Sequence, residues 1–366
     1  MNILIAPNSM KGSLSAFDFS DTVEKAFLDC SHAFKTKKVP VADGGDFTGE
    51  VLQRANNAEI IQTEVIGPLG KKVQSKFAVY ENTAIIEMAD ASGMKLVEQS
   101  SLNPLKATSY GTGQLIQEAL KNGCTEILLA IGGSATVDGG MGMMEALGFE
   151  FFDVQKKKLS GNGSNLSKIH SIRTSRSERE FSIKIICDVD NPLLGENGAA
   201  AVFGPQKGAT PEMVIQLEKG LKNWSEILRV ETGKDLANIK GTGAAGGLSV
   251  PLLAFFETEI VEGANFVLSK LDFNEHLKWA DMVITGEGKI DSQTLSNKAP
   301  YAVALAAKKL NIPVYAFAGI AEKLKSEVFD GIYTLVNEKV SKEMAINNPK
   351  EHLYNLAFEF AKSIKA

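Results

Sequence analysis

A glycine-rich segment, residues 132–143, lies between an apolar run and an apolar, helix-like stretch. Glycine lets the backbone take positive φ and approach a ligand closely. Amide groups at the start of a helix also favour bound anions. We therefore predict a phosphate-handling enzyme whose nucleotide-binding residues are Gly132, Gly133, Ser134, Thr136, Asp138, Gly139 and Gly140. The alternative is a tight strand-to-helix turn, which would account for one or two glycines but not for five.

Two carboxylates follow another apolar run. Asp188 and Asp190 come directly after residues 183–187 and before Pro192. Carboxylates act as general bases, and an Asp-x-Asp pair can hold a hard cation such as Mg²⁺ through its oxygens. We predict that one of the two is a general base and that Asp190 also binds the metal. An Asx-type turn before the proline is the alternative.

Polar side chains also follow the strands expected near the two ends of the chain. Asn8, Ser9 and Lys11 follow the first strand, and Asp43 and Gly44 follow the second. The third is followed by residues 285–292, in which glycines flank two carboxylates, Glu287 and Asp291. Such carboxylates suit Mg²⁺ binding or general-base chemistry. Because parallel strands end at one edge of a sheet, we expect these loops to share one rim.

Two lysines are candidates for binding an anion. Lys11 and Lys207 each lie in a loop beside small residues. A lysine supplies a point charge for a phosphate or a carboxylate. An exposed turn lysine explains either position equally well, so both alternatives stay open.

The composition indicates a protein that acts on a small molecule. The chain has 366 residues, of which 44% are hydrophobic, and a formal net charge of −5. This length favours two domains, and the negative charge argues against nucleic-acid binding. No apolar run approaches the ~20 residues that cross a bilayer. The lack of a signal-peptide pattern and the three widely spaced cysteines predict a cytoplasmic protein with no disulfide, zinc site or membrane contact.

The order of the expected elements predicts an α/β protein with two domains. Short strands near both ends of the chain alternate with helices, at residues 15–28 and 299–310 among others; the strands are at 3–6, 38–42, 282–284, 314–317 and 332–336. This alternation predicts a flavodoxin-like, doubly wound parallel sheet with the first strand beside the third. Residues 60–87, interrupted by Gly67-Pro68-Leu69-Gly70, predict a hairpin and a mixed sheet. We expect a discontinuous flavodoxin-like domain, residues 1–60 and 260–366, with an inserted mixed-sheet α/β domain, residues 61–259.

Other motifs carry less weight. Residues 241–246 form a G-x-G-x-x-G, but the preceding polar residues 232–240 do not resemble a strand. A nicotinamide-dependent oxidoreductase is therefore only a rival hypothesis. Neither a P-loop nor a G-x-S-x-G nucleophile motif occurs in the sequence. The four histidines lie outside the glycine segments, so catalysis by histidine is not expected.

Taken together, these segments resemble the type I glycerate kinase family. The matching stretches run in order along nearly the whole chain: IAPNSMKGSLSA, VADGG, IEMADASG, NPLKATSYGTGQLI, IGGSATVDGGMGM, CDVDNPLLG, GAAAVFGPQKGATPEM, GTGAAGG and VITGEGKIDSQT. The resemblance implies ATP-dependent phosphorylation of D-glycerate with Mg²⁺, with 2-phosphoglycerate as the favoured product. It also implies two α/β domains that face each other across a cleft. We expect a monomer or a homodimer.

Two positions depart from the family pattern. The family usually has aspartate where this chain has Asn8, and Asp-Gly-Gly-Glu-Gly-Thr where this chain reads DGGDFT at residues 43–48. The lost charge at position 8 weakens contact with a cation or a substrate hydroxyl. Phe47 replaces a glycine and restricts the loop. These departures leave open a kinase of a related hydroxy acid, or a non-catalytic homologue that binds a sugar acid or a nucleotide.

The resemblance and the residues together suggest a mechanism. The ATP phosphates would lie on amides of residues 132–140 and on a catalytic lysine, Lys207 or Lys11, with Gly286 and Gly288 adding to the nucleotide site. Glu287 and Asp190 would bind Mg²⁺, and Asp188 or Asp190 would accept the hydroxyl proton. D-glycerate would contact five residues, with its carboxylate on Lys11 or on amides near Ser9: Asn8, Ser9, Asp43, Gly44 and Asp291.

Overall fold

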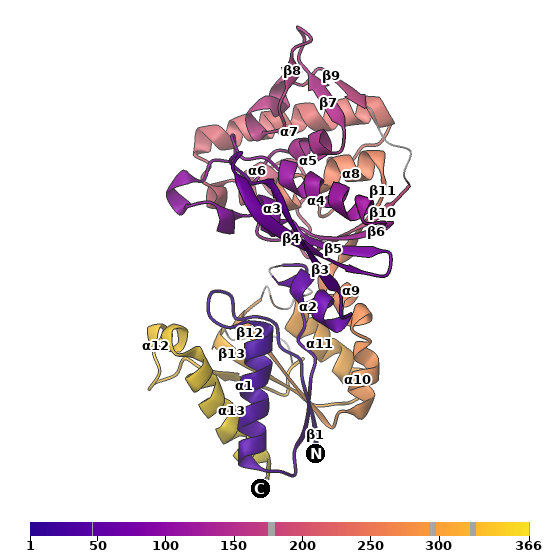
Figure 1. Cartoon of the computed structure of the whole chain (residues 1–366). Coiled ribbons are helices and arrows are strands. Elements are labelled where there is room, and N and C mark those ends of the chain that lie inside the picture. The colour runs from indigo at the N-terminus through magenta and orange to yellow at the C-terminus, as the bar shows by residue number, and fades with distance from the viewer. Residues whose placement is uncertain (46, 175–179, 293, 295–297, 323–326, 366) are drawn as a thin grey trace. The chain divides into compact units, whose positions relative to one another are not determined.

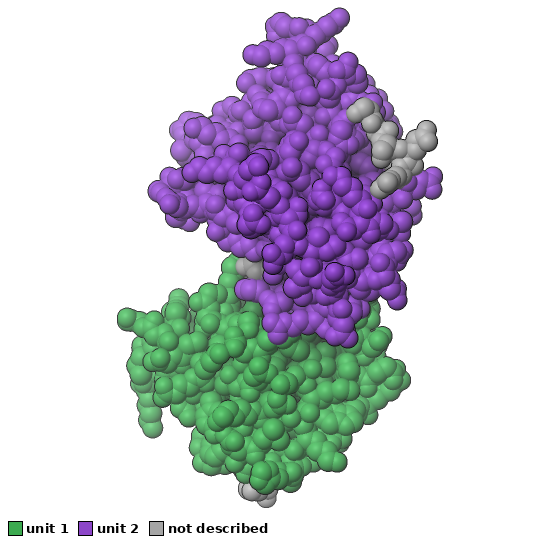
Figure 2. Space-filling model, in the orientation of Figure 1, with its two compact units in different colours: residues 1–43, 262–366 green, residues 44–261 purple. Residues whose placement is uncertain are grey.

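The computed structural model describes the chain except residues 46, 175–179, 293, 295–297, 323–326 and 366. The described chain forms two compact units (Figures 1 and 2). Unit 1 comprises residues 1–43 and 262–366, and unit 2 comprises residues 44–261. The first boundary falls after Asp43, earlier than residue 60, because α2 (Thr48–Ala55) packs on strands β4 and β5 of unit 2.

Unit 1 is built on a parallel sheet of five strands in the order β14-β13-β12-β1-β2. The strands are β1 (Asn2–Ile5), β2 (Lys35–Lys38), β12 (Met282–Ile290), β13 (Val314–Ala321) and β14 (Gly331–Thr334). β1 pairs with β12, with Ile3 opposite Met282, so the expected neighbourhood of the first and third strands is confirmed. Parallel strands with apolar side chains on both faces need helices to cover them.

The second strand of unit 1 differs from the prediction. It spans Lys35–Lys38 at the edge of the sheet, and the expected apolar residues 39–42 follow it. Val39 and Val41 continue the backbone bonding by donating to the carbonyls of Ile5 and Pro7, each at 2.9 Å. An edge strand has one open side and tolerates lysines. Hydrophobicity alone therefore placed this strand too late in the sequence.

The helices of unit 1 bury aromatic side chains against the sheet. They are α1 (Ala16–Cys30), α9 (Gly263–Lys270), α10 (Phe273–Trp279), α11 (Ala299–Lys308), α12 (Lys342–Asn347) and α13 (Pro349–Lys365). The helix predicted at residues 15–28 is confirmed as α1, and Ser15 caps it, because Ser15 Oγ accepts a hydrogen bond from the Asp18 amide at 3.0 Å. Phe19 and Phe27 of α1 share the core with Phe317 of β13.

Unit 2 contains a six-stranded mixed sheet in the order β11-β10-β6-β5-β4-β3. Its strands are β3 (Glu59–Ile66), β4 (Lys72–Tyr80), β5 (Thr83–Glu87), β6 (Glu126–Ala130), β10 (Ser182–Cys187) and β11 (Glu257–Glu262). β5, β6 and β10 are parallel, whereas β3, β4 and β5 form antiparallel pairs. The predicted hairpin is therefore confirmed, and Gly70 supplies a positive φ of 81° in its turn.

Helices and a small antiparallel sheet complete unit 2. The helices besides α2 are α3 (Ala89–Ser92), α4 (Tyr110–Lys121), α5 (Met141–Ala146), α6 (Ala199–Phe203), α7 (Pro211–Thr232) and α8 (Ser249–Phe255). The small sheet has the order β8-β7-β9, from β7 (Phe149–Phe152), β8 (Lys158–Leu159) and β9 (Ser171–Thr174). The helix-like stretch after the glycine-rich segment forms α5, which ends at Ala146; Gly148 takes a φ of 94° and Phe149 begins β7.

Thr210 Oγ1 caps α7, and the fully buried Trp224 of this helix contributes to the core of unit 2. Among the described residues, no helix combines the length and the apolar content that crossing a membrane requires.

Candidate active site

Three parallel strands of unit 2 end at one edge of its sheet. β5 ends at Glu87, β6 at Ala130 and β10 at Cys187. Open α/β sheets bind ligands at the carboxyl ends of such strands. Glu87, the turn 131–134 and Asp188 lie at these strand ends. We call this the carboxyl edge of unit 2.

The residues that lead into α2 lie against this carboxyl edge. The Gly44 amide donates to Thr48 Oγ1 at 3.0 Å, and a Cβ at Gly44 would lie 3.3 Å from Asp188 Oδ2. The Gly49 amide donates to Glu87 Oε1 at 2.7 Å. The start of α2 is thus held against the ends of two strands, β10 and β5. Glycine at position 44, where φ is +89°, permits the close approach to Asp188.

The two aspartates after β10 have different surroundings. Asp190 forms an ion pair with Lys240 at 2.9 Å, and both side chains are about four-fifths exposed. Such an exposed pair is a surface feature of small energetic weight. Asp188 is half-buried, and its Oδ2 atom is shielded from solvent beside Gly44. Of the two predicted bases, Asp188 is therefore the one at the carboxyl edge.

Asp138 lies in the interior of unit 2. It has no exposed surface, and its carboxylate accepts hydrogen bonds from the Ser109 amide at 2.7 Å, from Ser109 Oγ at 2.8 Å, and from the amides of Gly140 and Gly142 at 3.2 Å. Burial raises the pKa of Asp138, and these hydrogen bonds oppose the shift. The carboxylate therefore organises the start of α5.

Gly139 and Gly140 also make packing contacts inside unit 2. The Gly139 amide donates to the carbonyl of Gly246 at 3.0 Å, and Trp224 Nε1 donates to the carbonyl of Gly139 at 2.8 Å. A Cβ on Gly139 would lie 2.5 Å from Trp224 Cδ1. These glycines permit tight internal packing at positive φ, in contrast to the phosphate contact expected from the sequence. Gly246 of the G-x-G-x-x-G motif takes part in the same packing.

The turn at residues 132–134, which precedes Asp138 in the chain, is more accessible to solvent than Asp138. Gly132 and Gly133 are half-buried, and the carbonyl of Gly133 accepts a hydrogen bond from the Met94 amide at 2.9 Å. Ser134 is buried and follows them at the carboxyl edge. Of the predicted glycine segment, residues 132–134 therefore remain the part best suited to meet a ligand.

Lys207 is fully buried in unit 2 and hydrogen-bonds to this turn from the interior. Its ammonium donates to Ser134 Oγ at 2.7 Å and to the carbonyl of Thr136 at 2.8 Å. Burial lowers the pKa of Lys207 to about 7, and the carboxylate of Asp138 acts in the opposite direction. Its 2% exposure leaves no route to a phosphate in solution. Lys207 thus hydrogen-bonds to this turn from the interior of unit 2.

Unit 1 has its own polar cluster where β1 ends. Asn8 Nδ2 donates to Asp43 Oδ2 at 3.0 Å, and Asn8 Oδ1 accepts from the Ser9 amide at 2.7 Å. The Asn8 backbone amide donates to the carbonyl of Gly286 at 2.8 Å. Three of the predicted substrate-binding residues, Asn8, Ser9 and Asp43, are therefore adjacent. The fourth, Gly44, follows Asp43 in the chain and belongs to unit 2.

Two carboxylates of β12 and the turn after it share Thr294. Thr294 Oγ1 donates to Glu287 Oε1 at 2.7 Å, and the Thr294 backbone amide donates to Asp291 Oδ1 at 3.3 Å. Burial raises the pKa of Glu287 to about 7, although Thr294 and Lys298 partly offset it. Asp291 also pairs with Lys289 at 2.9 Å. Within the described part of the chain, no three His, Cys, Asp or Glu side chains form a ready-made metal site.

The remaining predicted residues of unit 1 differ in accessibility. Gly286 is buried, and a Cβ there would clash with the carbonyl of Phe317 on β13. It therefore serves sheet packing rather than a nucleotide. Gly288 is half-buried near the Lys11 backbone, and Lys11 is exposed. Lys11 is thus the predicted lysine that an anion can reach.

Sequence reasoning assigned no role to Glu87 and Ser109. Both lie in segments that match the family, IEMADASG and NPLKATSYGTGQLI. Glu87 could have been found as the polar residue that ends an apolar strand. Ser109 carries no such signal, because its partner Asp138 is distant in the sequence.

Comparison with known sequences identifies one family over nearly the whole chain. The sequence model of the glycerate kinase family matches residues 3–365. The chain is 40% identical to glycerate kinase of Bacillus subtilis, covering 100% of this chain and 98% of that protein. It is 44% identical to glycerate kinase of Haemophilus influenzae, covering 90% and 89%. It is 41% identical to glycerate 2-kinase of Escherichia coli, covering 87% and 85%.

A solved structure agrees with this result. A crystal structure of a protein named as a glycerate kinase 2, from Salmonella typhimurium LT2, superposes on this chain with a TM-score of 0.85. Its sequence is 39% identical, and the match covers 100% of this chain and 98% of the other. The arrangement of a parallel five-stranded sheet and a mixed six-stranded sheet therefore matches a related fold.

Proposed function

The chain belongs to the glycerate kinase family, and we propose that it transfers the terminal phosphoryl group of ATP to the 2-hydroxyl of D-glycerate. Membership makes it a phosphotransferase and implies the use of ATP. The observation that carries the proposal is the family match over residues 3–365 at about 40% identity to named glycerate kinases. The name of the Escherichia coli relative, glycerate 2-kinase, supports the choice of hydroxyl.

Asp188 is the general base in this proposal. Its position at the carboxyl edge, beside Gly44, supports the assignment, and the exposed Asp190–Lys240 pair argues against the neighbouring aspartate. A carboxylate that accepts the hydroxyl proton needs to be near the substrate and only partly solvated. Phosphoryl transfer depends mainly on positioning and charge neutralisation, so the base acts with several other groups.

The half-buried turn at Gly132 and Gly133 binds phosphates through backbone amides, and Lys207 fixes that turn through Ser134 and Thr136. Lys207 is then a positioning residue. In unit 1, Asn8 and Asp43 contact the hydroxyls of D-glycerate, and the exposed Lys11 pairs with its carboxylate.

Mg²⁺ neutralises charge on the transferring phosphates when bound. The carboxylates of Glu287 and Asp291 provide the oxygen ligands that Mg²⁺ prefers. One or two protein carboxylates suffice, because the phosphates and water supply the other ligands. The exposed pair of Asp190 with Lys240 makes Asp190 the weaker of the two predicted ligands.

The strand order of unit 1 supports a flavodoxin-like, doubly wound architecture for it, interrupted by the inserted unit 2. A cytoplasmic monomer or homodimer remains the expectation for its state and place in the cell.

A coupled assay tests the proposal. Release of ADP, followed with pyruvate kinase and lactate dehydrogenase, should require ATP, Mg²⁺ and D-glycerate together. Asn8 motivates a parallel series with other small hydroxy acids, because the family usually carries aspartate there. Faster turnover of another acid would reassign the substrate. Binding of ATP without turnover of any acid would identify a non-catalytic homologue.

A further inference from the structure

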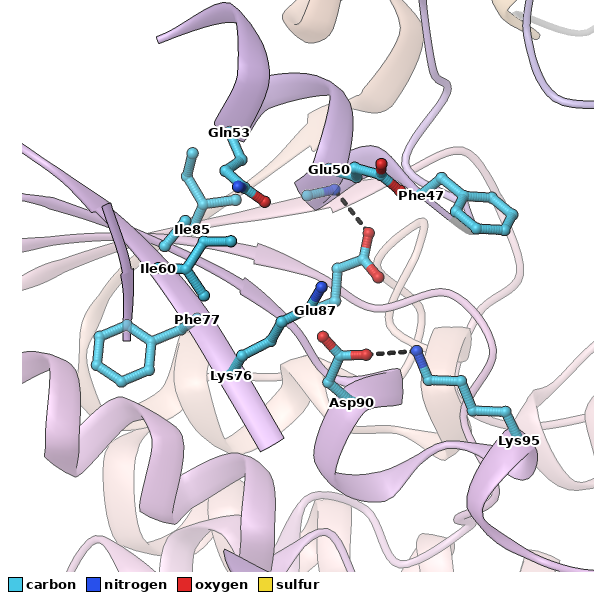
Figure 3. A pocket seen from close by; sticks show the side chains of 12 residues that line it. Phe47, Glu50, Gln53, Ile60, Lys76, Phe77, Ile85, Glu87, Asp90 and Lys95 are labelled. Carbon is cyan, nitrogen blue, oxygen red and sulfur yellow. Dashed lines mark hydrogen bonds and ion pairs between the residues drawn. The ribbon is translucent and has the colours of Figure 1, made fainter. Parts of the chain in front are cut away.

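A cavity on unit 2 adjoins the carboxyl edge (Figure 3). It has a volume of about 120 Å³ and lies between α2 and the strands β3, β4 and β5. Pockets that enclose a whole drug-sized molecule measure roughly 300–1,000 Å³. The cavity therefore accommodates one ring system rather than a complete nucleotide.

The lining of the cavity combines apolar and polar groups. Ile60 and Ile85 supply apolar surface, and Gln53, Lys76 and Glu87 supply polar atoms. A nucleobase has two apolar faces and an edge that carries donors and acceptors. The carboxamide of Gln53 can both donate and accept, and a carboxylate accepts from an exocyclic amino group. D-glycerate, a three-carbon polar acid, has no apolar face to match this wall.

The cavity is connected to the phosphate-binding turn by hydrogen bonds. The Met94 amide donates to the carbonyl of Gly133, and the Ala135 amide donates to the carbonyl of Ser92, each at 2.9 Å. Lys95 follows Met94, lines the cavity and forms an ion pair with Asp90 (Figure 3). If the ring of a ligand lies in the cavity and its phosphates extend toward the turn, the ligand therefore lies near the ammonium group of Lys95.

Phe47 lines the same cavity in an unusual backbone conformation. Its φ is +69°, a region that bulky residues rarely adopt and that glycine enters freely. The residue is 41% exposed. Phe47 therefore holds an aromatic side chain at the rim of the cavity in a backbone conformation typical of glycine.

We propose that this cavity is the subsite for the adenine ring of ATP, with Phe47 stacking on the base and Lys95 contacting the phosphates. The inference rests on the proposed function and deepens it, because it assigns the nucleoside end of ATP to residues of unit 2.

Phe47→Gly tests the stacking contact. Glycine adopts positive φ without strain, so the substitution removes the ring and keeps the loop. Because stacking on a base is a substantial contact, the KM for ATP should rise about tenfold. The KM for D-glycerate should not change. Inhibition by inorganic tripolyphosphate, which has phosphates but no base, should also be unaltered.

Lys95→Met tests the phosphate contact and should weaken ATP and tripolyphosphate alike. The matched control is Lys156→Gly, which removes an exposed side chain at φ +62° in the turn between β7 and β8. This control should leave every constant at its wild-type value. A rise in the KM for D-glycerate equal to the rise for ATP would indicate a general loop defect and overturn the subsite.

An unchanged KM for ATP in Phe47→Gly and Lys95→Met, with normal turnover by the wild-type chain, overturns the subsite and leaves the proposed function intact. If the wild-type chain shows no turnover, the proposed function fails. The affinity for ADP, measured by calorimetry in the wild-type chain and in Phe47→Gly, then tests the subsite. Binding about tenfold weaker in Phe47→Gly supports it, and equal binding overturns it.

Discussion

The buried ammonium of Lys207 donates a hydrogen bond of 2.7 Å to the hydroxyl of Ser134. A second bond to the carbonyl of Thr136 fixes the same turn at the carboxyl edge of unit 2. Burying a charge costs free energy unless the group is paired or gives up its proton. Because of that cost, burial lowers the pKa of Lys207 to about 7. Lys207 therefore links the stability of unit 2 to the geometry of its candidate phosphate site.

The pH dependence of stability should reveal this lysine. Its pKa is about 7 in the folded state against a reference of 10.5, so the unfolded chain binds more protons between these values. The contribution of this pKa difference to the free energy of unfolding is fully present above the pKa of Lys207 in the unfolded state. It is lost as the pH falls through the pKa of Lys207 in the folded state. The free energy of unfolding should rise from pH 7 to 9, relative to Lys207→Met, by up to about 1.4 kcal/mol per pH unit. Urea unfolding at several pH values measures the difference, and parallel curves for the two proteins would contradict it.

Asp138→Asn should destabilise the protein by about 2–4 kcal/mol, because an amide replaces a buried carboxylate that accepts hydrogen bonds from four donors. The new NH₂ group would face backbone N–H groups that it cannot accept from. Asp153→Asn is the matched control, since Asp153 accepts two amide hydrogen bonds in an exposed turn. Urea unfolding should show a much smaller loss for the control. Equal losses would argue against the buried network.

Asp188→Asn should lower kcat at least about a hundredfold, the usual contribution of a general base. Asp190→Asn should change kcat little, because its carboxylate is exposed and pairs with Lys240. Steady-state kinetics of both variants, with thermal unfolding to verify that each is folded, separates the two. Near wild-type kcat in Asp188→Asn would remove this residue from the mechanism.

Asn8→Asp places a second carboxylate at the position of the Asn8 amide group, whose Nδ2 lies 3.0 Å from Asp43 Oδ2. Two close carboxylates repel, which raises their pKa values in the folded state. Stability should therefore fall as pH rises from 4 to 8. Asn8→Ala, which removes the hydrogen bond without adding charge, should show a loss that does not depend on pH. Thermal unfolding of both variants across this pH range tests the expectation, and a pH-independent loss in Asn8→Asp would contradict it.

The sequence predicted elements whose signals are local. The Ser15 cap precedes an amphipathic helix, and the Gly67–Gly70 turn separates two strands of a hairpin. The pairing of β1 with β12 was also predictable, because parallel α/β units follow simple rules of strand order. The edge strand β2 was misplaced because its residues are lysines and a threonine rather than apolar ones.

The roles of the glycines depended on distant residues. Gly139 contacts Trp224 and Gly246, and Asp138 is held by Ser109, so the sequence could not show that their polar groups are already in use. Lys207 was ambiguous for the same reason, since only the fold shows that it is buried. The glycine motif therefore indicated one segment of unit 2 as a candidate site, but it could not separate the turn 132–134 from the internally packed residues that follow it.

Phosphorus NMR of the reaction product tests the central claim most directly. With ATP, Mg²⁺ and D-glycerate, the proton-coupled spectrum should gain a phosphomonoester resonance split into a doublet, because the phosphorus of 2-phosphoglycerate couples to a single proton. A triplet would show transfer to the 3-hydroxyl instead. Consumption of ATP with only inorganic phosphate as the new species, or no consumption at all, would contradict the account.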